Sequence, residues 1–152
     1  MGAPCSFCDT NNEKYEFSTI DKKDAVLIRN ELLTRKNLLE PYVPQHVRFD
    51  NKIREDRPEY TFLNGDVYIG EWDIKTKRID GNGELFSLND ESLYEGHFVN
   101  GCRSIHGRVV FRNGDVYTGG WMNDEMMGTG KFTSADGKSV YEGEWVANEK
   151  HG

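Results

Sequence analysis

Long apolar segments are absent from this 152-residue chain, which has no run approaching the roughly 18–20 residues that a membrane-spanning helix needs. Its N-terminus also lacks the basic and apolar regions of a secretory signal. Only 36% of the residues are hydrophobic, whereas glycine is abundant, with 16 residues. This composition suits a thin sheet better than a deep globular core, in one domain or a small repeat array with an extension.

Cysteine is scarce, with three residues at Cys5, Cys8 and Cys102. An odd count without a secretory signal predicts free thiols in a reducing, cytoplasmic compartment. A structural zinc site needs four ligands, and Cys5-x-x-Cys8 has no second Cys/His pair nearby. We therefore expect neither a metal nor another cofactor.

The first residues, Met1–Ser6, fit a short N-myristoylation pattern. Gly2 would carry the myristoyl chain after removal of Met1, and Cys5 is a plausible second acylation site, because stable anchoring takes two chains. No basic cluster accompanies the pattern. The alternative is that residues 1–17 are a disordered or extended N-terminus that matches the pattern by chance.

Positive charge is lacking in the C-terminal part of the chain. Residues 1–57 contain ten Lys/Arg and ten Asp/Glu, whereas residues 58–152 contain nine and sixteen, which accounts for the whole net charge of −7. Nucleic acids and anionic lipids attract positive charge, so this acidic region disfavours direct binding of either. It favours a basic or amphipathic protein partner.

Catalytic motifs are also missing. The chain has no phosphate-binding loop, no Gly-x-Ser-x-Gly and no His-Glu-x-x-His. Gly81-Asn82-Gly83 is not a dinucleotide fingerprint, because no helix is expected after it. The acidic residues are scattered, and we expect no catalytic residues and no enzyme.

What the chain does contain is one motif in four copies. The pattern is Tyr-x-Gly-x-Trp/Phe, and its tyrosines lie 26, 23 and 24 residues apart. A fixed period of this size is typical of a repeat architecture. Since residues i, i+2 and i+4 of a strand share one face, the Tyr, Gly and Trp/Phe of each copy lie together. The copies are Tyr68–Trp72, Tyr94–Phe98, Tyr117–Trp121 and Tyr141–Trp145.

A glycine-rich strand and a tight turn complete each repeat. The segments Gly81–Leu85, Gly107–Phe111 and Gly128–Phe132 again alternate small and apolar residues with period 2. Asn64-Gly65, Asn113-Gly114 and Asp136-Gly137 are strong hairpin signals. Short turns force antiparallel pairing of sequence neighbours, so the fold is predicted to be mainly β, a single-layer antiparallel β-meander.

These residues resemble the MORN repeat family (membrane occupation and recognition nexus), with Phe98 and Val109 as departures from its pattern. The resemblance covers residues 60–152, as a partial unit, three repeats and a fourth that stops after its first strand. It implies an elongated, twisted, solenoid-like array. It also implies the roles of such proteins in ciliary axonemes, flagella, cytoskeletal scaffolds and membrane junctions.

The residue pattern of the N-terminal third predicts a helix followed by a linker. Ala25, Ile28, Leu32 and Leu39 form one stripe, widened by Leu33 and Leu38, so an amphipathic helix is expected over residues 18–40. It would cap the array or bind a partner. Residues 41–59, which include the charged run 50–57, are expected to form an extended linker that runs along the array.

The predicted binding surface is an exposed groove lined by the repeat aromatics, because the opposite face of the motif strands is mostly polar. The rings would also hold the repeats together. The candidate partner-binding residues are Tyr68, Trp72, Tyr94, Phe98, Tyr117, Trp121, Tyr141 and Trp145.

The expected function is a non-catalytic scaffold that holds a partner peptide or helix in a ciliary or cytoskeletal assembly. The open sheet edge at Gly152 would offer a second contact, for a partner or a second copy. The alternative is a membrane tether acylated at Gly2 and Cys5.

Overall fold

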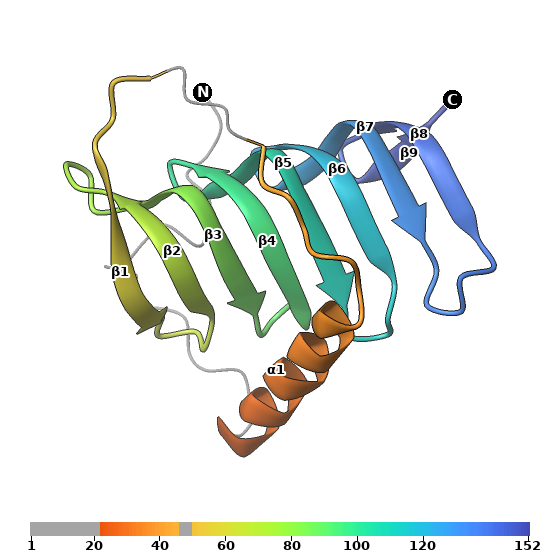
Figure 1. The fold of residues 1–152 in the computed structure, drawn as a ribbon, viewed down its shortest axis with the longest axis horizontal. Coiled ribbons are helices and arrows are strands. Elements are labelled where there is room, and N and C mark those ends of the chain that lie inside the picture. Colours follow the sequence, from red (N-terminus) through yellow and green to blue (C-terminus); the bar gives the residue numbers. More distant parts are fainter. Residues whose placement is uncertain (1–21, 46–49) are drawn as a thin grey trace.

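The computed structural model describes residues 22–45 and 50–152, and these ranges form one helix and one nine-stranded sheet (Figure 1). The helix, α1, spans Lys22–Asn37. The strands are β1 Arg54–Thr61, β2 Val67–Asp73, β3 Ile79–Ser87, β4 Ser92–Val99, β5 Cys102–Phe111, β6 Val116–Met122, β7 Glu125–Thr133, β8 Val140–Val146 and β9 Glu149–His151.

The sheet is a meander, as predicted. Its strand order follows the sequence from β1 to β9, and every neighbouring pair is antiparallel. The turn glycines Gly65 and Gly114 have φ angles of 91° and 98°, which favour glycine. In both turns an asparagine side chain accepts a hydrogen bond from the backbone N–H two residues later, at 2.9 Å. Local turn chemistry therefore sets the connectivity.

The register shifts at one recurring position. It changes between Gly70 and Trp72, between Gly96 and Phe98, and between Gly119 and Trp121. Such bulges bend a strand and increase its local twist. Because the shifts recur at the same point of the motif, each repeat adds a similar bend.

Strand β1 corrects the predicted linker over residues 41–59. Residues 54–61 are a strand paired with β2, and the register shifts between Arg57 and Tyr60, around Pro58. Since β1 lies at the sheet edge and most of its residues are exposed, it can be charged and lack a period-2 pattern. Pairing with the repeats, rather than intrinsic propensity, makes it a strand.

Helix α1 ends earlier than predicted. It ends at Asn37, where Leu38 and Leu39 donate backbone hydrogen bonds three residues back, to Arg35 and Lys36. This tight last turn points Leu38 into solvent, 83% exposed, so its predicted place in the apolar stripe is wrong. Residues 18–21 lie outside the described residues. Residues 22–45 and 50–152 contain one helix, α1, and it is too short and too polar to cross a membrane.

Cys102, in β5, is disulfide-bonded. The prediction that it is a free thiol is therefore wrong. Cys5 and Cys8 lie outside the described residues, as do Gly2 and its expected acylation.

Candidate functional site

The repeat aromatics form one continuous contact chain on what we call the front face, the face that carries the Tyr, Gly and Trp/Phe positions. The Tyr94 ring lies 5.1 Å from Phe98 in its own repeat and 5.2 Å from Trp121 in the next. The Tyr117 ring lies 5.5 Å from Trp121 and 5.0 Å from Trp145. All four contacts are edge-to-face, a favourable geometry for aromatic pairs. Tyr94 and Tyr117 thus each link two repeats.

Glycines on the neighbouring strand make room for these tyrosine rings. The Tyr94 ring lies over Gly107, and the Tyr117 ring lies over Gly130, so closely that a Cβ at either glycine would overlap the ring. Each hydroxyl then donates to a backbone carbonyl three residues ahead, Tyr94 to His97 at 2.8 Å and Tyr117 to Gly120 at 2.9 Å. The glycine beneath each ring and the carbonyl that accepts from its hydroxyl therefore both fix the position of the tyrosine.

The tryptophans are fixed in the same way, with one exception. Trp121 Nε1 donates to the carbonyl of Gly107, and Trp145 Nε1 donates to that of Gly130, both at 3.2 Å. Trp72 Nε1 is buried without a hydrogen-bond partner among the residues that the structure describes. The residue that pairs with the motif glycine here is Arg57, where the β1 register shifts. The edge strand thus lacks the acceptor that the inner strands supply.

The front face is a core and not an exposed groove. Seven of the eight candidate residues are at most 6% exposed, and Tyr141 is partly exposed. The predicted aromatic groove is therefore wrong for those seven, because the rings of adjacent repeats cover one another. Partner contact by the eight residues stays a prediction. Among them, Tyr141 is the residue whose side chain is open enough to meet a partner without a change in the fold. The seven are Tyr68, Trp72, Tyr94, Phe98, Tyr117, Trp121 and Trp145.

The reverse face, opposite the motif rings, is partly apolar, which the prediction of a polar reverse face missed. Leu93 precedes the motif tyrosine and Val110 follows Val109, and both are 2% exposed. Ile28 and Leu32 of α1 pack on them, with Val67, Phe86 and Leu88 in the same cluster. The predicted docking of the helix on the array is therefore confirmed, on a face of the sheet (Figure 1).

Ion pairs fix the C-terminal end of the helix on the same face. Lys36 Nζ contacts the carboxylate of Glu84 and lies 3.9 Å from that of Glu95. Arg108 contacts Glu95 and donates to the backbone carbonyl of Glu40 at 2.6 Å. These side chains are 10–24% exposed, so water screens the pairs less than at an open surface.

The segment after the helix continues across the sheet, as expected for a linker that runs along the array. The Tyr42 ring stacks on His106 with 5.8 Å between centroids, and a hydrogen bond of 2.8 Å joins Tyr42 Oη and His106 Nδ1. Burial raises the pKa of Tyr42 to about 12 and lowers the pKa of His106. A protonated hydroxyl and a neutral imidazole match this hydrogen bond. A cavity of about 300 Å³ lies beside Tyr42, between this segment and strands β2–β4.

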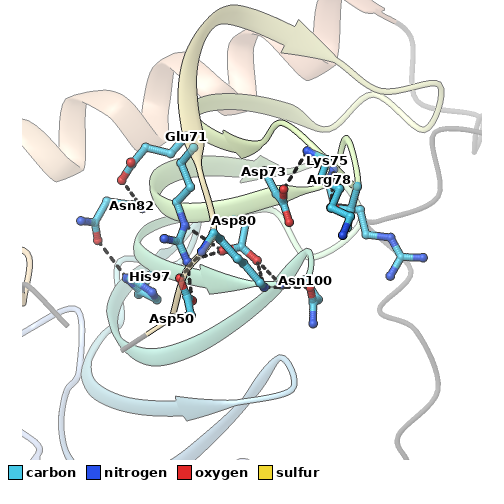
Figure 2. Close-up of polar contacts among 12 residues, drawn as sticks. Asp50, Glu71, Asp73, Lys75, Arg78, Asp80, Asn82, His97 and Asn100 are labelled. Carbon is cyan, nitrogen blue, oxygen red and sulfur yellow. Dashed lines mark hydrogen bonds and ion pairs between the residues drawn. The ribbon is translucent and has the colours of Figure 1, made fainter. Parts of the chain in front are cut away.

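A polar cluster fixes the last part of the N-terminal segment (Figure 2). The Asp80 carboxylate is fully buried and accepts from Lys52 Nζ at 2.8 Å and Arg54 Nε at 2.9 Å. The backbone N–H of Asn100 donates to it at 2.8 Å. A buried carboxylate needs such partners. Asp80 therefore ties residues 52–54 to strand β3 and to the turn between β4 and β5.

His97 lies in the same region of the sheet (Figure 2). Its Nδ1 contacts Asn82 Oδ1 at 3.3 Å, and the Asn82 backbone N–H donates to Glu71 Oε1 at 2.9 Å. Burial, followed by the charge of Arg54, lowers the pKa of His97. Asp80, Glu71 and Asp50 oppose this shift. The imidazole is therefore held neutral and acts as a structural hydrogen-bond donor.

The arrangement can bind protein segments non-covalently. Within residues 22–45 and 50–152, no group of three or more His, Cys, Asp or Glu side chains could hold a metal ion. The residues that hold the N-terminal segment were missed by sequence reasoning. The missed residues are Lys36, Tyr42, Lys52, Arg54, Asp80 and Arg108. A signal for the docking face was present in the sequence, because an apolar residue directly precedes each motif tyrosine and a strand places it on the reverse face.

The comparison with protein families agrees with the repeats. The family model described as MORN repeat matches residues 94–116, 117–139 and 141–152. The repeat that begins at Tyr68 lies outside these ranges, although its Tyr68 ring meets Trp72 and Phe98 in the same edge-to-face contacts. No curated protein sequence matches the chain significantly.

Proposed function

The chain belongs to the MORN repeat family, whose repeats are non-catalytic modules for protein or membrane interactions, and from this premise we propose that it is a scaffold that binds a protein partner. The partner is a peptide or helix of another subunit in a larger assembly. The preferred setting is a ciliary or cytoskeletal structure.

One observation supports the proposal most strongly: the array already binds a helix. The reverse face holds α1 through the buried side chains Ile28 and Leu32 and through Lys36 on Glu84. The contacts combine an apolar row with charge pairs at its side, as in helix–groove recognition. A surface that accepts a helix from its own chain has the chemistry to accept one from a partner.

Charge favours a protein over a lipid surface. The exposed strand residues of the reverse face over β8 and β9 include Glu142, Glu144 and Glu149. Anionic lipids attract basic clusters and are repelled by acidic ones. Tight binding of the purified chain to anionic vesicles at physiological salt would contradict this part of the proposal.

A partner could also pair with a sheet edge. Strand β9 lies at one edge of the described sheet and β1 lies at the other. The bulge and Pro58 protect β1 against further pairing, so β9 is the edge that we propose for a strand of a partner or of a second copy.

Crosslinking mass spectrometry in cells of the native source tests the function. We expect crosslinks to one or a few proteins of a complex that stays with the detergent-extracted axoneme or cytoskeleton. Recovery of the chain as an uncrosslinked monomer in the soluble fraction would overturn the proposal.

Acylation of Gly2 and Cys5 stays a separate prediction, in the part of the chain that is not described. Intact-protein mass measures it directly. A native protein that keeps Met1 and carries no lipid would remove the alternative of a membrane tether.

A further inference from the structure

We propose that the reverse face over β7 and β8 is a second helix-binding site, which takes a basic amphipathic helix of a partner protein beside α1. We call this surface the bare patch and define it as Lys131, Thr133, Val140, Glu142 and Glu144. The proposal rests on the scaffold function above and names the place and the chemistry of the contact.

The bare patch repeats the α1 site two repeats further along the sheet. In the α1 site, Leu93 and Glu95 of β4 lie opposite Phe86 and Glu84 of β3. In the bare patch, Val140 and Glu142 of β8 lie opposite Thr133 and Lys131 of β7. The motif tyrosines Tyr94 and Tyr141 are 47 residues apart, and these four pairs of positions match one for one.

The same positions differ sharply in burial. Leu93 and Phe86 are each 2% exposed in the cluster that docks the helix, whereas Val140 is 55% exposed. Glu142 and Lys131 are exposed too, whereas Glu95 and Glu84 are partly buried. The row of apolar residues that α1 covers thus continues past the helix, through Val116 to Val140. The bare patch is continuous with an existing helix–sheet interface.

Helix α1 shows which ligand chemistry the site accepts. Ile28 and Leu32 are one turn apart and fill the apolar row, and Lys36, one turn later, reaches Glu84 and Glu95. Glu142 holds the motif position of Glu95, whereas Lys131 holds that of Glu84, so Glu142 is the carboxylate that the two sites share. An incoming helix would therefore place two apolar residues on Val140 and Thr133 and a Lys or Arg on Glu142.

The charge around the patch favours a basic partner. The reverse-face strand residues of β7–β9 include four exposed glutamates and one exposed lysine: Glu125, Glu142, Glu144, Glu149 and Lys131. Opposite charge speeds the encounter and sets the orientation of a binding helix. A helix with acidic flanks would be repelled.

The occupant is a different protein and not a second copy. In this chain the helix that fits such a site, α1, has Ile28 and Leu32 buried on its own sheet, at 4% and 0% exposure. A second copy would have to remove that helix from its docking surface, which costs about the free energy of two buried aliphatic side chains. A partner with a free amphipathic helix has no such cost.

A peptide with the sequence of residues 22–40 is a suitable probe, because it carries the side chains that fit the equivalent site. Fluorescence anisotropy would measure binding of the labelled peptide to the full chain. We expect saturable binding that weakens with salt, and weakening by about tenfold or more in Val140→Glu and in Glu142→Lys, since one loses the apolar contact and the other gains repulsion.

Glu125→Lys is the matched control, because it makes the same charge change on the same face outside the bare patch. It should change the affinity less than twofold. All three positions are exposed, and unchanged thermal unfolding would show that the variants fold. No binding at 1 mM peptide (a dissociation constant of 1 mM corresponds to about −4 kcal/mol) would overturn the proposal. So would equal weakening by Glu142→Lys and Glu125→Lys, or binding insensitive to Val140→Glu, which would place the peptide in the α1 site.

Crosslinking in the native source separates this inference from the scaffold function. We expect Lys131 to crosslink to a basic, helical segment of the partner. If the partner crosslinks only elsewhere on the chain, the bare patch is wrong while the scaffold function stands. If no partner crosslinks at all, the scaffold function itself is wrong.

Discussion

At the scale of single residues, the glycines of the glycine-rich strands leave room for the tyrosine rings. Gly107 has no positive φ, so its backbone would accept any residue, and what excludes a side chain there is the Tyr94 ring. Gly137 is the opposite case: nothing lies within 4 Å of its Cβ position, but its φ is 71°. Substitutions at these two glycines therefore distinguish the effect of steric exclusion from that of backbone strain.

We predict that Gly107→Ala lowers the free energy of unfolding by about 3 kcal/mol or more, because the new methyl group displaces a fully packed ring. Gly137→Ala should cost only about 1 kcal/mol, the strain of a positive φ. Urea unfolding followed by circular dichroism measures both. Equal small losses would show that the sheet relaxes around the extra methyl group.

A second residue-scale prediction concerns pH. The pKa of His97 is lowered in the folded chain, so below about pH 6.5 the unfolded state binds protons that the folded state does not, and stability falls. His106 contributes in the same direction. Thermal unfolding between pH 7.5 and pH 5 should show this loss, with a smaller slope in His97→Gln. An unchanged slope would mean that His97 does not couple to folding.

At the scale of elements, α1 is held by its buried side more than by its own propensity. A 16-residue helix is marginal alone in water, and Leu32 is fully buried in the cluster that docks it. The helix stripe and its docking were predictable from the spacing of Ala25, Ile28 and Leu32. Its end at Asn37 and the exposure of Leu38 were not, because they depend on where the segment after the helix meets the sheet.

Leu32→Ala should detach α1 by removing about 2–5 kcal/mol of packing. Hydrogen exchange would then rise over residues 22–37, while the amides of β6–β8 stay protected. Leu27→Ala makes the same chemical change at a side chain that is 59% exposed, and it should leave the exchange unchanged. Faster exchange throughout the sheet in Leu32→Ala would show that helix and sheet unfold as one unit.

Strand β1 was the element that sequence reasoning missed. Its residues have no period-2 pattern, and only pairing with β2 from Arg54 to Thr61 makes them a strand. An edge strand buries little, so the core imposes no alternation on its sequence.

At the scale of the whole molecule, the rings couple the repeats. Trp121 and Trp145 each contact the tyrosine of the preceding repeat, Tyr94 and Tyr117, and each donates to a backbone carbonyl across the sheet. In a repeat array each unit is stabilised by its neighbours. Loss of these contacts should therefore spread beyond one repeat.

The double variant Trp121→Ala with Trp145→Ala should lose much of its β-sheet signal in circular dichroism, because each truncation of a buried tryptophan costs about 3–5 kcal/mol. Trp121→Phe, which keeps a ring and loses the indole hydrogen bond, should keep the fold with a lower unfolding midpoint. A double variant that folds normally and only binds less would instead restore the rings as a binding surface.

The sequence by itself determined the meander, because the period-2 motifs and the Asn-Gly and Asp-Gly turns act locally. It also determined which residues share a face, since the Tyr, Gly and Trp positions alternate along each strand. The tertiary structure decided that the rings are buried and that the reverse face binds a helix. Burial depends on what neighbouring repeats and the N-terminal segment place over a residue, and no local pattern encodes that. For the same reason, Leu93 and Val140 hold equivalent positions in the sequence but differ in the fold, where one lies under α1 and the other lies open.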